Sequence, residues 1–183
     1  MLSLIARIPN PDELRSYLTD LLPLFQKDVS RYAPNRRRLW LFHEPNLSHN
    51  KSIKSACFDD RLWQLSQRVY PGCHTALISY NGSGSDGRIT PHRDDTYSRD
   101  RAVGINLGEA TFAYHCDRKG LDSAGMTEYS LGDGDIYSFH CKHLHAVTAA
   151  SDGRFSITFW QFKHDSRYPW CKPCNPEVIE RLK

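Results

Sequence analysis

The sequence predicts an α+β domain that is mainly β, with a double-stranded β-helix (jelly-roll) core and N-terminal helices packed on it. Two observations carry this prediction. Up to residue 72 the apolar residues recur at helical spacing, whereas later they form short β-rich runs separated by Gly, Asp and Ser. Eight such runs lie between residues 75 and 162, which is the strand number of a jelly roll.

Two helices are expected before residue 72. Asn10-Pro11-Asp12-Glu13 supplies a capping side chain, a proline for the first helical position and acidic residues beside the positive end of the helix dipole. A second helix is expected from about Asp59 to Val69, where Pro71-Gly72 ends it. The apolar residues that should bury one face of the first helix are Leu14, Leu18, Leu21, Leu22 and Phe25.

The expected strands follow in close succession, and the whole chain of 183 residues fits one domain. Residues 1–72 would form a helical N-terminal layer and candidate substrate lid, 73–163 the β core, and 164–183 a C-terminal tail. The strands are expected at Thr75–Tyr80, Arg88–Pro91, Ala102–Leu107, Thr111–His115, Thr127–Leu131, Asp135–His140, His145–Thr148 and Phe155–Phe162.

Composition excludes several classes of protein. With 39% hydrophobic and 25% charged residues, the chain is neither disordered nor collagen-like. No apolar run approaches the roughly 20 residues of a membrane-spanning helix, and the apolar stretch at Met1–Ile8 is too short for a signal peptide. The net charge of +3 is mild for a nucleic-acid-binding protein. We therefore expect a soluble, cytoplasmic monomer with no membrane partner.

The six cysteines are expected to be reduced thiols, because no export signal points to an oxidising compartment. Only Cys171 and Cys174 have paired spacing. A structural zinc site needs four ligands, so this lone pair is interpreted as two thiols in the tail.

Chemically informative residues lie in three separated segments. His92 and Asp94 are two residues apart, so on an extended segment both side chains point to one face. About fifty residues later the chain offers His140, His143 and His145 as further candidate ligands. Two histidines and one carboxylate on one face of an octahedron are typical of non-heme Fe(II) oxygenases.

Arg154 and Ser156 begin the last expected strand and share one of its faces. A dicarboxylate cosubstrate that chelates the metal through its 2-keto acid end leaves a distal carboxylate. A buried guanidinium suits that group, and the hydroxyl of Ser156 can share it.

This ordered set resembles the Fe(II)- and 2-oxoglutarate-dependent dioxygenase superfamily, and within it the AlkB-like branch. The resemblance covers roughly residues 75–163. It implies that His92, Asp94 and His145 bind Fe(II), that Arg154 holds the distal carboxylate of 2-oxoglutarate, that Tyr80 and Ser156 assist, and that O2 is the oxidant. The segments that carry it are Tyr80, His92-Arg93-Asp94, Ile105-Asn106-Leu107-Gly108, Thr111-Phe112, Gly134-Asp135, His145-Ala146-Val147 and Arg154–Trp160.

The choice of the third ligand rests on strand parity and on this resemblance. Parity puts His143 and His145 on one face and His140 on the other. The short step from His145 to Arg154, and the Ala-Val that follows His145, fit the family's pattern best. His145 is therefore the expected ligand and His143 the first alternative.

The substrate is expected to be a small molecule that is hydroxylated or oxidatively dealkylated, with release of succinate and CO2. AlkB-type nucleic-acid demethylases carry R-x-N-x-T-x-R on the last strand. In this chain Arg154 and Thr158 match that motif, whereas Ser156 replaces the Asn and Trp160 replaces the second Arg. The loop from Tyr80 to His92, which contains residues 81–87, is also longer than the corresponding link in that family. Demethylation of N-alkylated bases is the alternative, and a non-catalytic metal-binding β-barrel is the second alternative.

Overall fold

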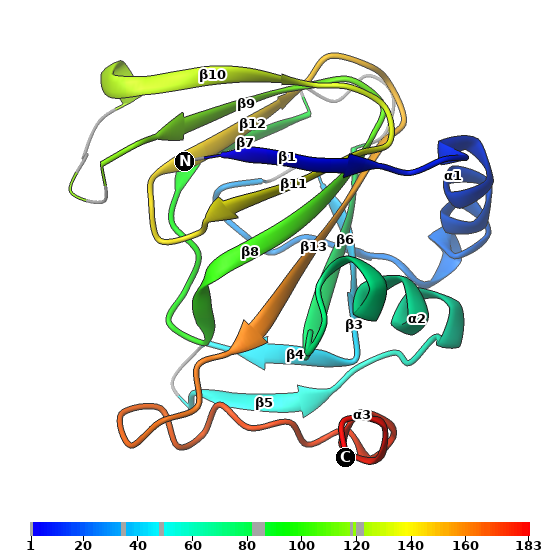
Figure 1. The fold of residues 1–183 in the computed structure, drawn as a ribbon, viewed down its shortest axis with the longest axis vertical. Coiled ribbons are helices and arrows are strands. Elements are labelled where there is room, and N and C mark those ends of the chain that lie inside the picture. Colours follow the sequence, from blue (N-terminus) through cyan, green and yellow to red (C-terminus); the bar gives the residue numbers. More distant parts are fainter. Residues whose placement is uncertain (1, 34–35, 48–49, 82–86, 118, 120–122) are drawn as a thin grey trace.

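The computed structural model describes residues 2–33, 36–47, 50–81, 87–117, 119 and 123–183. Two antiparallel sheets face each other (Figure 1). The larger has seven strands in the order β1-β11-β8-β13-β6-β3-β2, and the smaller has four in the order β10-β9-β12-β7. This arrangement confirms the predicted jelly-roll core.

All eight expected strands are present, and their ends lie within one residue of the expected ones except in β8, which begins at Ser98 rather than Ala102. In the larger sheet they are β6 (Thr75–Asn81), β8 (Ser98–Leu107), β11 (Asp135–His140) and β13 (Arg154–Phe162). In the smaller sheet they are β7 (Arg88–His92), β9 (Ala110–His115), β10 (Met126–Leu131) and β12 (His145–Ala149). Gly, Asp and Ser between the apolar runs thus mark the turns correctly.

The N-terminal part is not purely helical, which corrects the expected layer at 1–72. It also contains β1 (Ser3–Arg7), β2 (Gln26–Lys27), β3 (Arg37–Leu41) and the hairpin of β4 (His43–Asn46) and β5 (Ser52–Ser55). Strand β1 pairs with β11, and β3 pairs with β6. The first 72 residues therefore extend the larger sheet at both edges. All residues of β1 are exposed, so it lacks the apolar alternation that marks a strand in a sequence.

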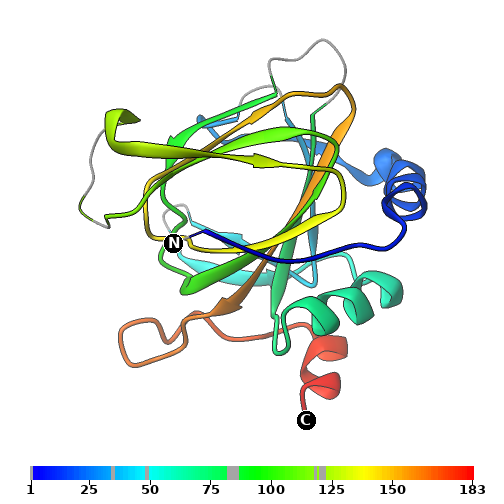
Figure 2. The same ribbon diagram turned by 45° about the horizontal axis from the view of Figure 1, so that its top comes forward.

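The two expected helices are confirmed as α1 (Pro11–Asp20) and α2 (Asp60–Val69). The side chains of Asn10 and Asp59 cap them by accepting from the backbone N–H groups of Glu13 and Leu62. Short 3-10 turns lie at Leu22–Leu24 and Ser123–Gly125, and the C-terminal helix α3 (Pro176–Arg181) lies beside α2 (Figure 2). Arg181 pairs there with Asp60. None of the helices in the described ranges is both long and apolar enough to cross a membrane.

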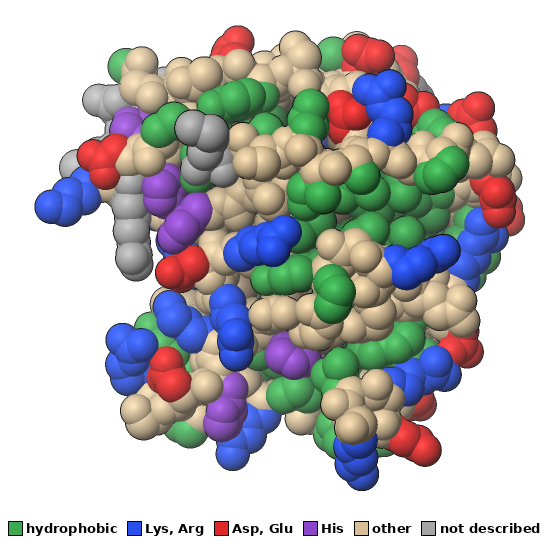
Figure 3. Space-filling view, viewed as in Figure 1, with side chains coloured by type: hydrophobic (Ala, Val, Ile, Leu, Met, Phe, Trp, Pro, Cys, Tyr) green, Lys and Arg blue, Asp and Glu red, His purple; other side chains and the backbone are tan. Residues whose placement is uncertain are grey.

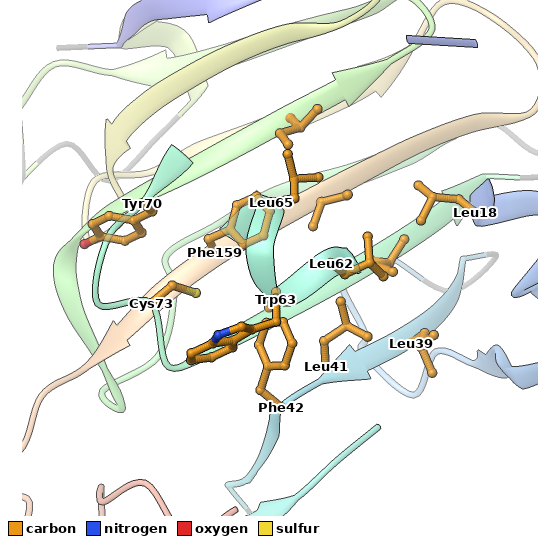
Figure 4. Close-up of a cluster of buried hydrophobic side chains, with 14 of the residues drawn as sticks. Leu18, Leu39, Leu41, Phe42, Leu62, Trp63, Leu65, Tyr70, Cys73 and Phe159 are labelled. Atoms are coloured by element: carbon orange, nitrogen blue, oxygen red, sulfur yellow. The ribbon is translucent and has the colours of Figure 1, made fainter. Parts of the chain in front are cut away.

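Both N-terminal helices pack on the outer face of the larger sheet. Leu18 of α1 and Leu62 of α2 are buried in one apolar cluster with side chains from β3, β6 and β13 (Figure 4). Phe155, Ile157 and Phe159 of β13 belong to this cluster. Because side chains alternate along a strand, Arg154, Ser156, Thr158 and Trp160 point the other way, into the space between the two sheets.

Candidate metal and cosubstrate site

A cavity of about 250 Å³ lies between the two sheets. Ser79, Arg154 and Ser156 of the larger sheet line it, as do His92, Phe112 and His145 of the smaller sheet. The walls combine aromatic and aliphatic side chains with convergent polar and charged ones, and such convergent polar groups are typical of a ligand site. The inward-facing positions of both sheets therefore make one chamber.

His92, Asp94 and His145 meet in this cavity. Their ligand atoms all lie within 4.8 Å of one another, and no other such group occurs among the described residues. Asp94 Oδ1 lies 3.6 Å from His92 Nε2 and 3.5 Å from His145 Nε2. Two neutral imidazoles and one carboxylate are a donor set that fits a divalent first-row metal ion, with room left for other ligands. The structure thus brings together the three residues that the sequence singled out.

The two imidazoles are oriented by backbone carbonyls. His92 Nδ1 lies 2.9 Å from the carbonyl oxygen of Thr90, and His145 Nδ1 lies 2.9 Å from that of His143. A carbonyl only accepts, so Nδ1 of each ring carries the proton and Nε2 presents its lone pair to the cavity. Burial and the neighbouring His145 lower the pKa of His92, which keeps it in the neutral, metal-binding form.

Asp94 reaches the site from beyond the end of a strand. The sequence argument placed His92 and Asp94 on one extended segment, but β7 ends at His92. Asp94 is held instead by its N–H, which donates to the carbonyl of Cys141, and by Oδ2, which accepts from Trp160 Nε1 at 2.8 Å. Burial opposes ionisation of Asp94, yet its interactions with His145 and His92 hold its pKa far below the usual range.

Arg154 is a buried cation with unused donors. Its Nε donates to Asn106 Oδ1 at 2.7 Å, while its two terminal nitrogens are buried without a hydrogen-bond partner. No carboxylate in the described part of the chain pairs with it. Such an arrangement is costly unless an anion completes it. The free pair of N–H groups fits the distal carboxylate of 2-oxoglutarate in a bidentate manner.

Asn106 is a site residue to which the sequence argument gave no role. Its Nδ2 donates to the backbone carbonyls of Gly108, Leu131 and Gly132, which fixes the orientation of the amide. Oδ1 is thereby directed at Arg154. The sequence signals were its place in the segment Ile105–Gly108 that resembles the family and its polarity within the apolar run of β8. Its pairing with Arg154, 48 positions away, could not be inferred from them.

Of the two other residues predicted to bind the cosubstrate, one lies at the cavity and one does not. Ser156 lines the cavity on the same face as Arg154. Tyr80 does not line it. Its ring packs on Phe155, 4.7 Å away between centroids, on the outer face of the larger sheet. The reason is parity: Tyr80 is opposite Phe155 in the ladder, whereas Ser79 is opposite Ser156 and faces inward. Tyr80 is therefore left out of the site. Most of the segment that follows it, 82–86, lies outside the described residues.

His143 and His140, the alternatives for the third ligand, point elsewhere. His143 Nδ1 bonds the carbonyl of His115, and its ring stacks on Tyr114 at 5.5 Å. His140 lies beside His143 and reaches toward Asp100. Among the three histidines, His145 is the one that joins His92 and Asp94.

Aromatic and basic residues surround the rest of the cavity. Tyr32 stacks on the ring of His92 with 5.4 Å between centroids, and Trp40 lies 6.0 Å from Trp160. Arg36 and Arg38 also line the cavity, but both face the buried carboxylate of Asp28. Arg38 and Trp40 belong to strand β3, and Tyr32 and Arg36 precede it in the chain.

Comparisons with known proteins agree with this geometry. The structure of OsALKBH1 superposes with a TM-score of 0.63 at 15% identity, over 87% of this chain and 97% of that one. The chain therefore has the fold of the 2OG-Fe(II) oxygenases. An oxidoreductase of the 2OG-Fe(II) oxygenase family from Burkholderia pseudomallei gives 0.55 at 14% identity, over 80% and 76% of the two chains. A prolyl-4-hydroxylase from Pseudomonas putida gives 0.54 at 16% identity, over 88% and 92%.

Comparison of the amino-acid sequence alone does not find this similarity. No protein-family model matches the chain, and no curated protein matches it either. The identities to the superposed structures are so low that the shared property is the fold. The chemistry is argued from the residues in the cavity.

Proposed function

We propose that the protein is an Fe(II)- and 2-oxoglutarate-dependent dioxygenase that hydroxylates or oxidatively dealkylates a small molecule. The observation that carries this proposal is the pairing of two features in one cavity. His92, Asp94 and His145 converge within 4.8 Å, and Arg154 offers two buried, unpartnered donors. A metal site alone has no use for a buried guanidinium, which argues against a binding module without turnover.

The cavity residues have separate roles in binding the metal and the cosubstrate. His92, Asp94 and His145 would hold Fe(II) on one face, and Arg154 with Ser156 would hold the distal carboxylate of 2-oxoglutarate. The bound pair supplies the oxidative decarboxylation with O2 that releases succinate and CO2 and hydroxylates a nearby C–H bond. Phe112, Phe139 and Val147 line the same cavity and exclude water from it. When the hydroxylated carbon is attached to nitrogen, the product collapses to an amine and an aldehyde.

Local charge favours a small molecule over a nucleic-acid strand. Arg36 and Arg38 of the cavity wall are neutralised within the protein, since Arg36 pairs with Asp28 and Arg38 lies 3.7 Å from Asp28 and 3.6 Å from Glu44. Tracking a phosphate backbone needs free cations. Figure 3 shows Lys and Arg side chains scattered among acidic ones on the face it presents, with no continuous basic stripe.

Two measurements test the proposal. Anaerobic addition of Fe(II) and 2-oxoglutarate is expected to give a weak visible charge-transfer band, and a folded protein that gives none is a binding module at most. Succinate release is then measured with a panel of amines and amino acids and with N-methylated oligonucleotides. Stimulation by the oligonucleotides alone would replace the small-molecule proposal with base demethylation.

A further inference from the structure

The carboxylate ligand of the proposed metal site lies on a segment that no strand pairing fixes. His92 and His145 sit opposite each other in the ladder between β7 and β12, so the sheet sets their separation. Asp94 comes two residues after β7 ends and four before β8 begins. Its position depends on one backbone hydrogen bond, to Cys141, and on contacts made by individual side chains.

Lys142 makes the largest number of these contacts. It lies in the turn between β11 and β12, three residues before His145, and only 8% of it is exposed. Its Nζ donates to the carbonyl of Asp94 at 3.3 Å, to the carbonyl of Asp95, and to Ser98 Oγ at 2.7 Å. All three ammonium protons are thus used on the segment 94–98, while the N–H of Asp94 donates back to Cys141.

Burying the ammonium group of Lys142 carries a large desolvation free energy, which a purely structural role does not require. No carboxylate in the described residues pairs with Lys142, so uncharged oxygen atoms alone offset its desolvation. An apolar side chain of similar length would fill the space at lower cost. Unlike an apolar side chain, the ammonium group donates three directed hydrogen bonds, which orient the backbone of the segment that carries Asp94.

We propose that Lys142 is a positioning residue, which ties the segment carrying Asp94 to the turn that leads into His145 and so sets the geometry of the metal site. This inference rests on the proposed function. Lys142 does not touch the metal position itself. It acts through the backbone of Asp94, and Trp160 completes the restraint by holding Oδ2 of the same carboxylate.

The test compares the apo protein and its Mn(II) complex, since Mn(II) suits the same ligands without redox chemistry. Lys142→Met keeps the length and removes the donors. Lys163→Met is the matched control, because its Nζ lies 3.8 Å from Asp100 and 5.4 Å from the centre of the Tyr168 ring. Only the backbone N–H of Lys163, which the substitution keeps, contacts the segment 94–98, at the carbonyl of Tyr97. Dissociation constants for Mn(II) are measured by electron paramagnetic resonance, and Co(II) absorption reports the ligand geometry.

Without metal, Lys142→Met is expected to be folded and to show a cooperative unfolding transition. It should bind Mn(II) about ten- to hundredfold more weakly than the parent protein, and its Co(II) complex should have a different absorption spectrum. Lys163→Met should match the parent. Parent-like affinity and spectrum in Lys142→Met would overturn the inference. Should that variant not fold, Ser98→Ala removes one of the three partners, and a several-fold weaker Mn(II) affinity supports the inference whereas an unchanged one refutes it. A parent protein that binds no Mn(II) would instead overturn the proposed function.

Discussion

His92 of β7 lies directly opposite His145 of β12 in the antiparallel ladder, with 4.4 Å between the ring centroids. Neighbouring strands are about 4.8 Å apart, so this register alone brings two imidazoles from distant parts of the chain to one point. A single backbone pairing thus positions two of the three ligands of the proposed metal site.

The first prediction concerns the identity of the second histidine. His145→Ala should abolish Mn(II) binding and turnover, because it removes one of three ligands from a cavity in which no described residue stands ready to replace it. His143→Ala is the control, since that ring stacks on Tyr114 away from the cavity. Isothermal titration with Mn(II) separates the two variants. Retained binding in His145→Ala would mean that the ligand set is wrong.

The second prediction concerns the cosubstrate. Arg154→Met should bind 2-oxoglutarate about a hundredfold more weakly or worse, because two charge-assisted hydrogen bonds are lost. Mn(II) affinity should be unchanged, since Arg154 does not belong to the metal-ligating group. Asn106→Leu should show a smaller effect of the same kind, as it removes only the acceptor that orients Nε. Equal 2-oxoglutarate affinity in the parent and Arg154→Met would contradict the assigned role.

Sequence predicted the parts of this site that depend on strand periodicity. Arg154 and Ser156 face the cavity because alternate residues of β13 do so, and the alternation of Phe155, Ile157 and Phe159 with polar residues already shows it. The same rule, applied to β6, also explains the error at Tyr80. The family resemblance implied a role for Tyr80, whereas its ladder position opposite Phe155 turns it outward.

The polar supports were beyond sequence reasoning for a different reason. Lys142 contacts residues 44 to 48 positions away, and Asn106 contacts Arg154 across 48 positions. No local pattern encodes such pairings, which form only when the sheets close. Strands β1 and β2 were not predicted for a third reason: they lie at the two edges of the larger sheet, where exposed side chains show no apolar period.

The third prediction concerns Trp160, the residue that stands where AlkB-type demethylases carry their second arginine. Trp160→Phe should keep the aromatic packing on Trp40 and lose the hydrogen bond to Asp94 Oδ2. Mn(II) affinity should fall several-fold, with the Co(II) spectrum altered. Trp170→Phe serves as the control, because Trp170 lies outside the cavity. An unaltered spectrum in Trp160→Phe would show that Oδ2 needs no donor.

The fourth prediction concerns Gly104 of β8. A Cβ built there would lie 2.3 Å from Cζ of Tyr137, a buried ring that lines the cavity. Gly104→Ala should therefore destabilise the fold by about 1–3 kcal/mol and narrow the cavity. Chemical denaturation measures the first effect and 2-oxoglutarate affinity the second. The double variant Gly104→Ala with Tyr137→Ala should recover cosubstrate binding if the clash is the cause.

The last prediction concerns pH. His43 Nε2 accepts from the N–H groups of Cys174 and Asn175, and His74 Nδ1 accepts from that of Phe162, so both rings must be neutral in the folded chain. Burial lowers the pKa of His43, and burial with the charges of His43 and Arg99 lowers the pKa of His74 to about 4.

The unfolded chain binds these two protons near the ordinary histidine pKa of about 6.5, whereas the folded chain does not. The contribution of the two neutral rings to the free energy of unfolding is therefore fully present above that pH. It should fall as the pH drops from about 6.5 toward 4. Urea unfolding at stepped pH measures the slope. The double variant His43→Gln with His74→Gln should flatten it, whereas His164→Gln, at an exposed position, should leave it as in the parent. An undiminished slope in the double variant would assign the acid sensitivity to other groups.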